Sequence, residues 1–267
     1  MRRWTTCWLV VAAGSIGVAR AQQPFYTDDA DVTARGGVHV ECFNEHDWLQ
    51  PSQAPHLQQN TFNMKVNYGM GRNLELDMDV PIITIVNDGS IVPQRPAGFG
   101  DLDFGVKYNF HQERDGSAVP AFSLVSYIEV PTGEVSTGLG SGLVDVWIYV
   151  VVQKTLPKDF VAHLNGGYLF HGNTSTGTVG ITTARGHVAT MGGSLVRKVS
   201  EAVTLGIDIT AAATRNAALE REQLQVMFGG NYALGRNFTV DAGVIAGHYT
   251  ASPRYGIQLG FSWDVPD

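Results

Sequence analysis

The sequence contains little cysteine and little charge. Of its 267 residues, two are cysteines and 16% are charged, whereas about 25% of a typical soluble domain is charged. Cys7 lies in the N-terminal apolar segment, so the rest of the chain has Cys42 alone and cannot form an internal disulfide. This excludes a small secreted domain stapled by disulfides. The net charge of −7 argues against a nucleic-acid partner, because such proteins carry basic patches.

Long apolar runs are also missing. Beyond the first 21 residues, no stretch reaches the roughly 20 apolar residues that a transmembrane helix needs. At the start, Arg2 and Arg3 precede a short apolar run at 8–18, and Ala19-Arg20-Ala21 has a small-x-small cleavage pattern. The run is too short for a membrane anchor, and the arrangement predicts a secretory signal peptide over residues 1–21.

What the sequence does contain is apolar residues with a period of two. Residues 73–82, NLELDMDVPI, set Leu76 and Met78 on one face of an extended strand and Asp77 and Asp79 on the other. The same alternation recurs in segments of about ten residues, the length of a tilted membrane strand. The segments are 36–43, 60–68, 73–82, 98–110, 121–130, 143–153, 159–171, 186–197, 201–211, 223–234, 237–247 and 255–263.

The connections and the count of these segments favour a membrane barrel. Short connections such as GMGRN and TLPKD alternate with long ones such as TIVNDGSIVPQRPA and PTGEVSTGLGSG. Short turns on one rim, long loops on the other and an even strand number are typical of outer-membrane barrels. We therefore predict an all-β fold, a closed antiparallel transmembrane β-barrel of about twelve strands over residues 36–267, with both ends periplasmic. The alternative is a soluble periplasmic β protein.

In such a barrel the apolar row faces lipid and the polar row faces the lumen. Aromatic residues gather at strand ends, where a bilayer interface favours them: Tyr68, Tyr108, Phe110, Tyr168, Phe170, Tyr232, Phe238, Phe261 and Trp263. The predicted lumen-facing residues are Glu41, Glu75, Asp77, Asp79, Asp101, Asp103, Lys107, Glu129, Asp145, His163, Asp208 and Asp241.

The clustered acids have two interpretations. Glu75, Asp77 and Asp79 share a face, and Asp101 and Asp103 should come from the neighbouring strand. Such carboxylates could favour cationic solutes, as acidic rings do in channels. Alternatively they form a solvated polar wall and pair with interior lysines such as Lys65 or Lys107. We expect neither a metal centre nor a cofactor.

The stretch before the first strand, TDDADVT, concentrates charge outside any predicted strand. Thr27, Asp28, Asp29 and Asp31 belong to a segment, residues 22–35, that could lie at the periplasmic mouth or enter the lumen. A role as a plug is a hypothesis that follows from this position.

Four stretches of the chain resemble a known family. They are PFYTDDADVTARGGVHVE, GFGDLDFGVKYNF, EVPTGEVSTGLGSGLVDVW and GGYLF, which resemble segments of the phenol meta-pathway degradation family of outer-membrane transporters. The resemblance implies a barrel in the bacterial outer membrane and passive uptake of small solutes, aromatic or apolar ones among them. The resemblance supplies no catalytic residues. The predicted barrel itself implies two partners, outer-membrane lipid and the barrel-assembly machinery.

Two rival functions stay open. His163 and Asn165 share a strand face, and Ser194 or Ser126 could serve as a nucleophile, but no GxSxG elbow occurs and we do not expect an enzyme. A structural or adhesion barrel acting through its extracellular loops is the other alternative. The glycine-rich GLGSG at 138–142 lacks the Lys-Ser/Thr ending of a phosphate-binding loop, and we interpret it as a flexible outer loop.

Overall fold

The computed structural model describes residues 23–172, 186–214 and 222–265. The predicted signal peptide, residues 1–21, lies outside this range, as do parts of two predicted outer loops at 173–185 and 215–221. Nowhere in this range is there a helix of the length and hydropathy that crossing a bilayer requires. The strands are β1 Val38–Trp48, β2 His56–Gly69, β3 Leu74–Asn87, β4 Ala97–Phe99, β5 Leu102–His111, β6 Ala121–Val130, β7 Asp145–Leu156, β8 Phe160–Gly172, β9 Gly186–Lys198, β10 Val203–Thr214, β11 Gln223–Ala233, β12 Phe238–Gly247 and β13 Tyr255–Val265.

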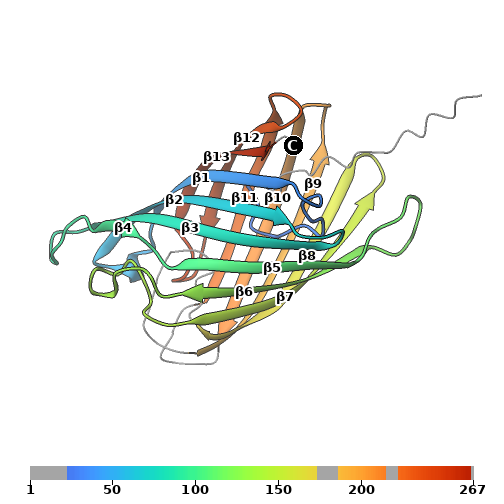
Figure 1. Cartoon of the computed structure of the whole chain (residues 1–267). Coiled ribbons are helices and arrows are strands. Elements are labelled where there is room, and N and C mark those ends of the chain that lie inside the picture. The colour runs from blue at the N-terminus through green and yellow to red at the C-terminus, as the bar shows by residue number, and fades with distance from the viewer. Residues whose placement is uncertain (1–22, 173–185, 215–221, 266–267) are drawn as a thin grey trace, which may run out of the picture.

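The strands form one closed antiparallel sheet. Each pairs with its neighbour along the chain, and β1 pairs with β13 from Val38 opposite Val265 to Trp48 opposite Tyr255. This pairing closes the wall seen in Figure 1. A barrel closed in this way leaves no strand-long open edge, although the short β4 pairs with β3 alone. The predicted fold class is confirmed.

The described strands occupy twelve positions in the barrel because β4 and β5 share one. Both pair with β3: β4 with Ile82–Thr84 and β5 with Leu74–Asp79. The break between them falls at Gly100 and Asp101, and Gly100 donates its N–H to the carbonyl of Pro81. Proline has no N–H to donate, so the ladder on this side loses a bond at Pro81, where the neighbouring strand is interrupted.

The alternation of residues sets the two faces of the wall. Leu76 is 37% exposed on the outside, whereas the next residue, Asp77, is 5% exposed. The same contrast holds on β7, where Ile148 and Val150 are exposed and Tyr149 is buried. All the predicted interface aromatics except Phe170, which is half-buried, are exposed on the outer face. The outer surface is therefore apolar, as contact with lipid requires.

One predicted loop is partly strand, and its interior face is apolar. Strand β3 runs to Asn87, beyond the expected end near Ile82, and Ile83 and Ile85 point inward and are buried. They pack against Leu139, which comes from the long loop between β6 and β7. The expectation of a uniformly polar interior is wrong here, because this loop folds inward and supplies an apolar partner.

Candidate functional site in the barrel lumen

The lumen contains a cavity of about 290 Å³. Its wall comes mainly from strands β1 to β7, and residues 23–33 border it from inside the barrel. Of the predicted lumen-facing residues, Glu41, Glu75, Asp79, Asp101, Asp103, Lys107, Glu129 and Asp145 line the cavity. The others, Asp77, His163, Asp208 and Asp241, are buried without lining it.

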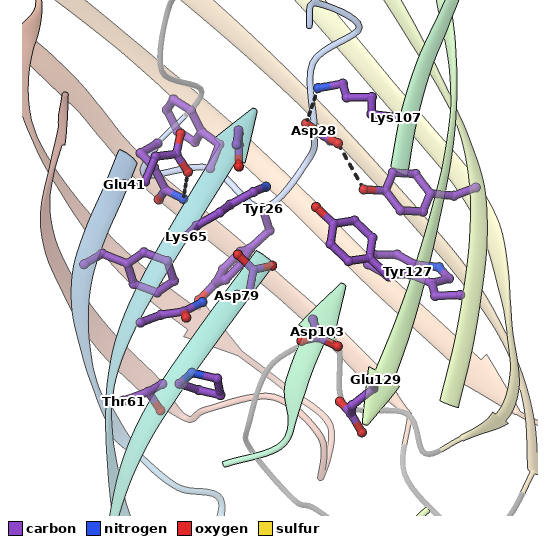
Figure 2. Close-up of a pocket in the computed structure, with 18 of the residues that line it drawn as sticks. Tyr26, Asp28, Glu41, Thr61, Lys65, Asp79, Asp103, Lys107, Tyr127 and Glu129 are labelled. Atoms are coloured by element: carbon purple, nitrogen blue, oxygen red, sulfur yellow. Dashed lines mark hydrogen bonds and ion pairs between the residues drawn. The ribbon is translucent and has the colours of Figure 1, made fainter. Parts of the chain in front are cut away.

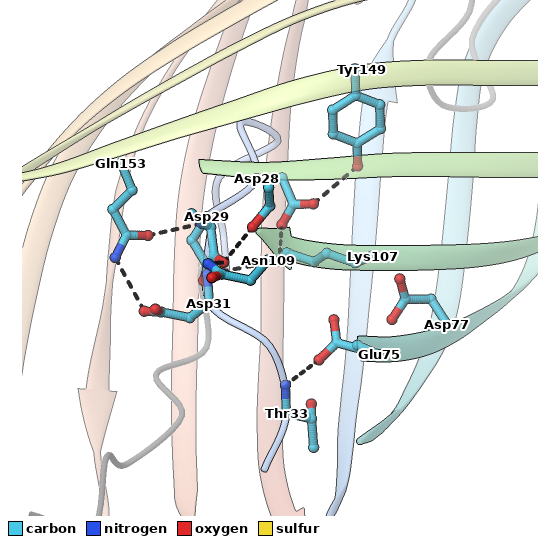
Figure 3. Close-up of polar contacts among 12 residues, drawn as sticks. Asp28, Asp29, Asp31, Thr33, Glu75, Asp77, Lys107, Asn109, Tyr149 and Gln153 are labelled. Carbon is cyan, nitrogen blue, oxygen red and sulfur yellow. Dashed lines mark hydrogen bonds and ion pairs between the residues drawn. The ribbon is translucent and has the colours of Figure 1, made fainter. Parts of the chain in front are cut away.

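Residues 23–35, here called the inner segment, run along the inner surface of the wall (Figure 3). Near their C-terminal end, Thr33 donates its N–H to Glu75 on β3. Further in, the carbonyl of Ala30 accepts hydrogen bonds from Asn109 on β5 and Ser123 on β6, both at 2.6 Å. The segment is thus fixed to three neighbouring strands through its own backbone.

The acidic motif of the inner segment meets a buried base. Lys107 Nζ lies 3.0 Å from Asp28 Oδ1 and 3.1 Å from Asp29 Oδ1, and the Tyr149 hydroxyl donates to Asp28 at 3.0 Å. Figure 3 shows these groups converging. Asp31 accepts a hydrogen bond from the Gln153 amide at 3.1 Å. Lys107 therefore pairs with the inner segment and not, as one interpretation held, with the acids of its own wall.

The pKa values of Asp28 and Asp29 shift in opposite directions in these surroundings. Burial alone would raise the pKa of Asp28, but Lys107, Lys65 and the Tyr149 hydroxyl together hold that pKa below its ordinary value. Burial raises the pKa of Asp29 to about 7; Lys107 counteracts this, and the charges of Asp31 and Asp28 add to it. The pKa of Asp29 therefore falls near neutral pH, whereas that of Asp28 lies well below it.

The N-terminal part of the inner segment reaches the opposite wall. Thr27 and the N–H of Tyr26 bind Asp208 on β10, and Phe25 packs against Met227 and Ile245. Gln23 contacts Glu41 on β1 and Gln258 on β13. The segment thus touches most of the strands in turn.

Wall glycines make room for this part of the inner segment. A Cβ on Gly192 of β9 would lie 2.7 Å from the Thr27 hydroxyl, and one on Gly229 of β11 would lie 2.6 Å from Pro24. Glycine inside a strand often marks close approach of another part of the chain. The glycine pairs in MGGS and FGGN were therefore a sequence signal for this packing, which sequence reasoning missed.

Asp101 holds the inward-folded loop. Its carboxylate accepts the N–H of Gly133 at 2.9 Å and that of Ser141 at 2.7 Å. Leu139 of the same loop is buried against Ile83 and Ile85. GLGSG, interpreted from the sequence as a flexible outer loop, is tied to the wall here, because the carboxylate of Asp101 binds backbone N–H groups near both ends of the loop.

Four carboxylates follow one another along the wall of the cavity, one on each of four successive strands. Strand register sets Asp79 opposite Asp103, Asp103 opposite Glu129, and Glu129 opposite Asp145. We call these four residues the acid row. Lys65 precedes the row opposite Asp79, and Figure 2 shows Lys65, Asp79, Asp103 and Glu129 in succession.

An aromatic wall borders the acid row. Tyr127 and Tyr149 stack with ring centroids 6.4 Å apart, and Trp147 lies 4.3 Å from Tyr149. All three line the cavity. In the sequence each of them shares a strand face with an acidic residue, and this pattern indicates that they point inward. Sequence reasoning nevertheless did not select them as candidate site residues.

The histidine-serine pairing considered from the sequence exists. His163 Nδ1 lies 2.9 Å from Ser194 Oγ across β8 and β9, and Ser126 lies on the outward-facing side of β6. His163 is 3% exposed and Ser194 6%, and neither lines the cavity. Within the part of the chain that the structure covers, no three His, Cys, Asp or Glu residues are grouped to hold a metal ion.

Comparison with known proteins places the chain among barrel proteins. The sequence family described as "Putative MetA-pathway of phenol degradation" matches residues 56–265, more than half of the chain. An outer-membrane channel from Pseudomonas putida F1 superposes with a TM-score of 0.67 at 12% identity, covering 89% of this chain and 98% of that chain. No curated protein matches.

Two porins have the same fold at lower similarity. The NanC porin superposes with a TM-score of 0.57 at 12% identity, covering 85% of this chain and 100% of its own. The KdgM porin gives a TM-score of 0.52 at 9% identity, with 85% and 99% covered. At such identities the likeness establishes the fold alone.

Proposed function

Because the chain belongs to the family described as a MetA-pathway of phenol degradation, we propose that it is a channel of the bacterial outer membrane through which small solutes pass passively. The observation that carries this proposal is the polar cavity inside a closed barrel with an apolar exterior. A wall that faces lipid outside and carries charged groups inside suits passage through the lumen. The aromatic wall adds a surface on which a small aromatic solute can lie.

In this proposal the inner segment narrows the path. Eight strands leave an interior filled by side chains and sixteen leave an open channel, so a twelve-stranded bore is of intermediate width. The inner segment occupies part of that width and is held there by Lys107, Tyr149 and Asp208. Native conductance is therefore expected to be small.

Liposome swelling tests the proposal. Liposomes containing the refolded protein are challenged with a neutral sugar, choline chloride and phenylalanine, and heat-unfolded protein serves as the control. We expect faster swelling than in the control for at least one solute. Swelling rates equal to those of the control for all three solutes would overturn the channel function.

The hydrogen bond between His163 and Ser194 supports a second candidate, a barrel hydrolase with Ser194 as nucleophile and His163 as general base. It predicts hydrolysis of a short-chain nitrophenyl ester that Ser194→Ala abolishes without changing solute flux. Ester hydrolysis that is absent, or that is unaffected by Ser194→Ala, would remove this candidate. Adhesion through the outer loops stays a prediction, because 173–185 and 215–221 lie outside the described residues.

A further inference from the structure

The acid row places four carboxyl groups side by side, and Lys65 stands at one end of it, opposite Asp79. Neighbouring strands are about 4.8 Å apart, and like charges directly opposite one another destabilise a sheet. Asp79, Asp103 and Glu129 form no ion pair within 4.0 Å with any other residue of the described chain. Nearby, Lys107 is already engaged by Asp28 and Asp29. A cation from outside the chain would compensate the row.

A second observation points to the same kind of ligand. Gln258 is 1% exposed and Asn67 9%, both line the cavity, and the side-chain oxygen of each has no hydrogen-bond donor. Among the described residues, the buried side-chain atoms that lack a hydrogen-bond partner are oxygens and include no nitrogen. The lumen thus has acceptors left over and needs donors, which water or an ammonium group can supply.

The aromatic wall extends this preference to organic cations. Lys65 Nζ lies 5.8 Å from the centroid of the Tyr127 ring, so one ammonium of the protein itself already lies over this surface. A cation within about 6 Å of an aromatic face is attracted by the ring quadrupole. Tyr127 and Trp147 are each two residues from a member of the acid row on the same strand face, Glu129 and Asp145.

We propose that the acid row and the aromatic wall make this lumen selective for small organic ammonium ions over anions. The row supplies the counter-charge, the unpaired oxygens accept N–H donors, and the rings cover the alkyl groups. An anion carries charge of the same sign as the carboxylates and would be repelled by them. The inference rests on the proposed channel function and specifies its class of solute.

Planar-bilayer recordings test the inference. Reversal potentials are measured in a potassium chloride gradient and then in a tetramethylammonium chloride gradient. We expect both to report cation selectivity. Asp103→Asn with Glu129→Gln should lower the cation-to-anion permeability ratio by about threefold or more, since two of four row charges are removed. Asp88→Asn, which removes an exposed loop charge, is the matched control and should leave the ratio unchanged.

The outcomes separate the two proposals. Absence of any conductance in correctly folded protein overturns the channel function and this inference with it. Conductance without cation preference, or with a preference that the double variant leaves intact, overturns the inference alone. Potassium selectivity with no current carried by tetramethylammonium overturns the assignment to organic ammonium ions. Trp147→Leu should reduce the tetramethylammonium-to-potassium permeability ratio and leave potassium-to-chloride selectivity in place.

Discussion

Two groups of acids share the lumen and have opposite surroundings. Asp28 and Asp29 of the inner segment are half-buried against Lys107, and Asp28 also binds the Tyr149 hydroxyl. Asp79 and Asp103 of the acid row stand opposite each other with no ion pair. The residue type is the same, but the first group is satisfied within the chain and the second is not. The first group therefore holds the inner segment in place, and under the proposed function the second meets the solute.

The largest effect is expected from removing the first group altogether. Deleting residues 23–34 empties the part of the lumen that the inner segment occupies, while the strands keep their pairing. Single-channel conductance should rise several-fold above that of the wild-type protein. Unchanged conductance in a deletion variant that still migrates as a folded barrel would show that the segment does not narrow the path.

A smaller increase in conductance should follow when Lys107, the base that pairs with the first group, is removed. Lys107→Gln leaves the half-buried Asp28 and Asp29 without their cation, and breaking a fully buried ion pair costs about 3–5 kcal/mol, which is an upper bound here. The inner segment should detach part of the time, so recordings should show frequent transitions to a higher conductance. Lys154→Gln is the matched control, because Lys154 pairs with Glu113 at the turn between β5 and β6. Identical traces from the two variants would contradict the anchoring role of Lys107.

The smallest effect concerns pH. The pKa of Asp29 is raised from 3.8 to about 7 in the docked segment, so the docked state takes up a proton that the free segment does not. Docking gains stability as pH falls and loses it as pH rises through about 7. The lowered pKa of Asp28 keeps that group ionised throughout this window. The higher-conductance state should therefore be more frequent at pH 8 than at pH 6.

Asp29→Asn should abolish this pH response, and Asp115→Asn, at an exposed turn position, should retain it. A response that survives in Asp29→Asn would assign the titration to another group. The lumen carries further acids and Lys107 near Asp29, so the variant is needed to identify the group.

The wall could be predicted from the sequence because its pattern is local. Leu76 outward and Asp77 inward follow from the two-residue period of a strand, and the same rule sets Trp147 and Tyr149 on one face with Asp145. The one-sided run of acids on β3 and its pairing with Asp103 were also readable, since neighbouring strands in a barrel follow chain order.

The contents of the lumen could not be predicted, because they depend on contacts between distant residues. Thr27 binds Asp208, which lies 181 positions away, and no periodicity relates the two. The inward fold of the loop at Leu139 depends on Asp101 and on Ile83, which are 38 or more positions away in the sequence. The sequence pattern alone treated Asp101 as one more wall acid and residues 84–97 as a loop.

The contacts of Gln23 also bear on the order of assembly. Its side chain is hydrogen-bonded to Glu41 and Gln258, which belong to the first and last strands of the barrel. These two partners come together only when β1 and β13 join. The N-terminal end of the chain, although synthesised early, can therefore reach its final place only after the seam has formed, so its docking reports a completed insertion.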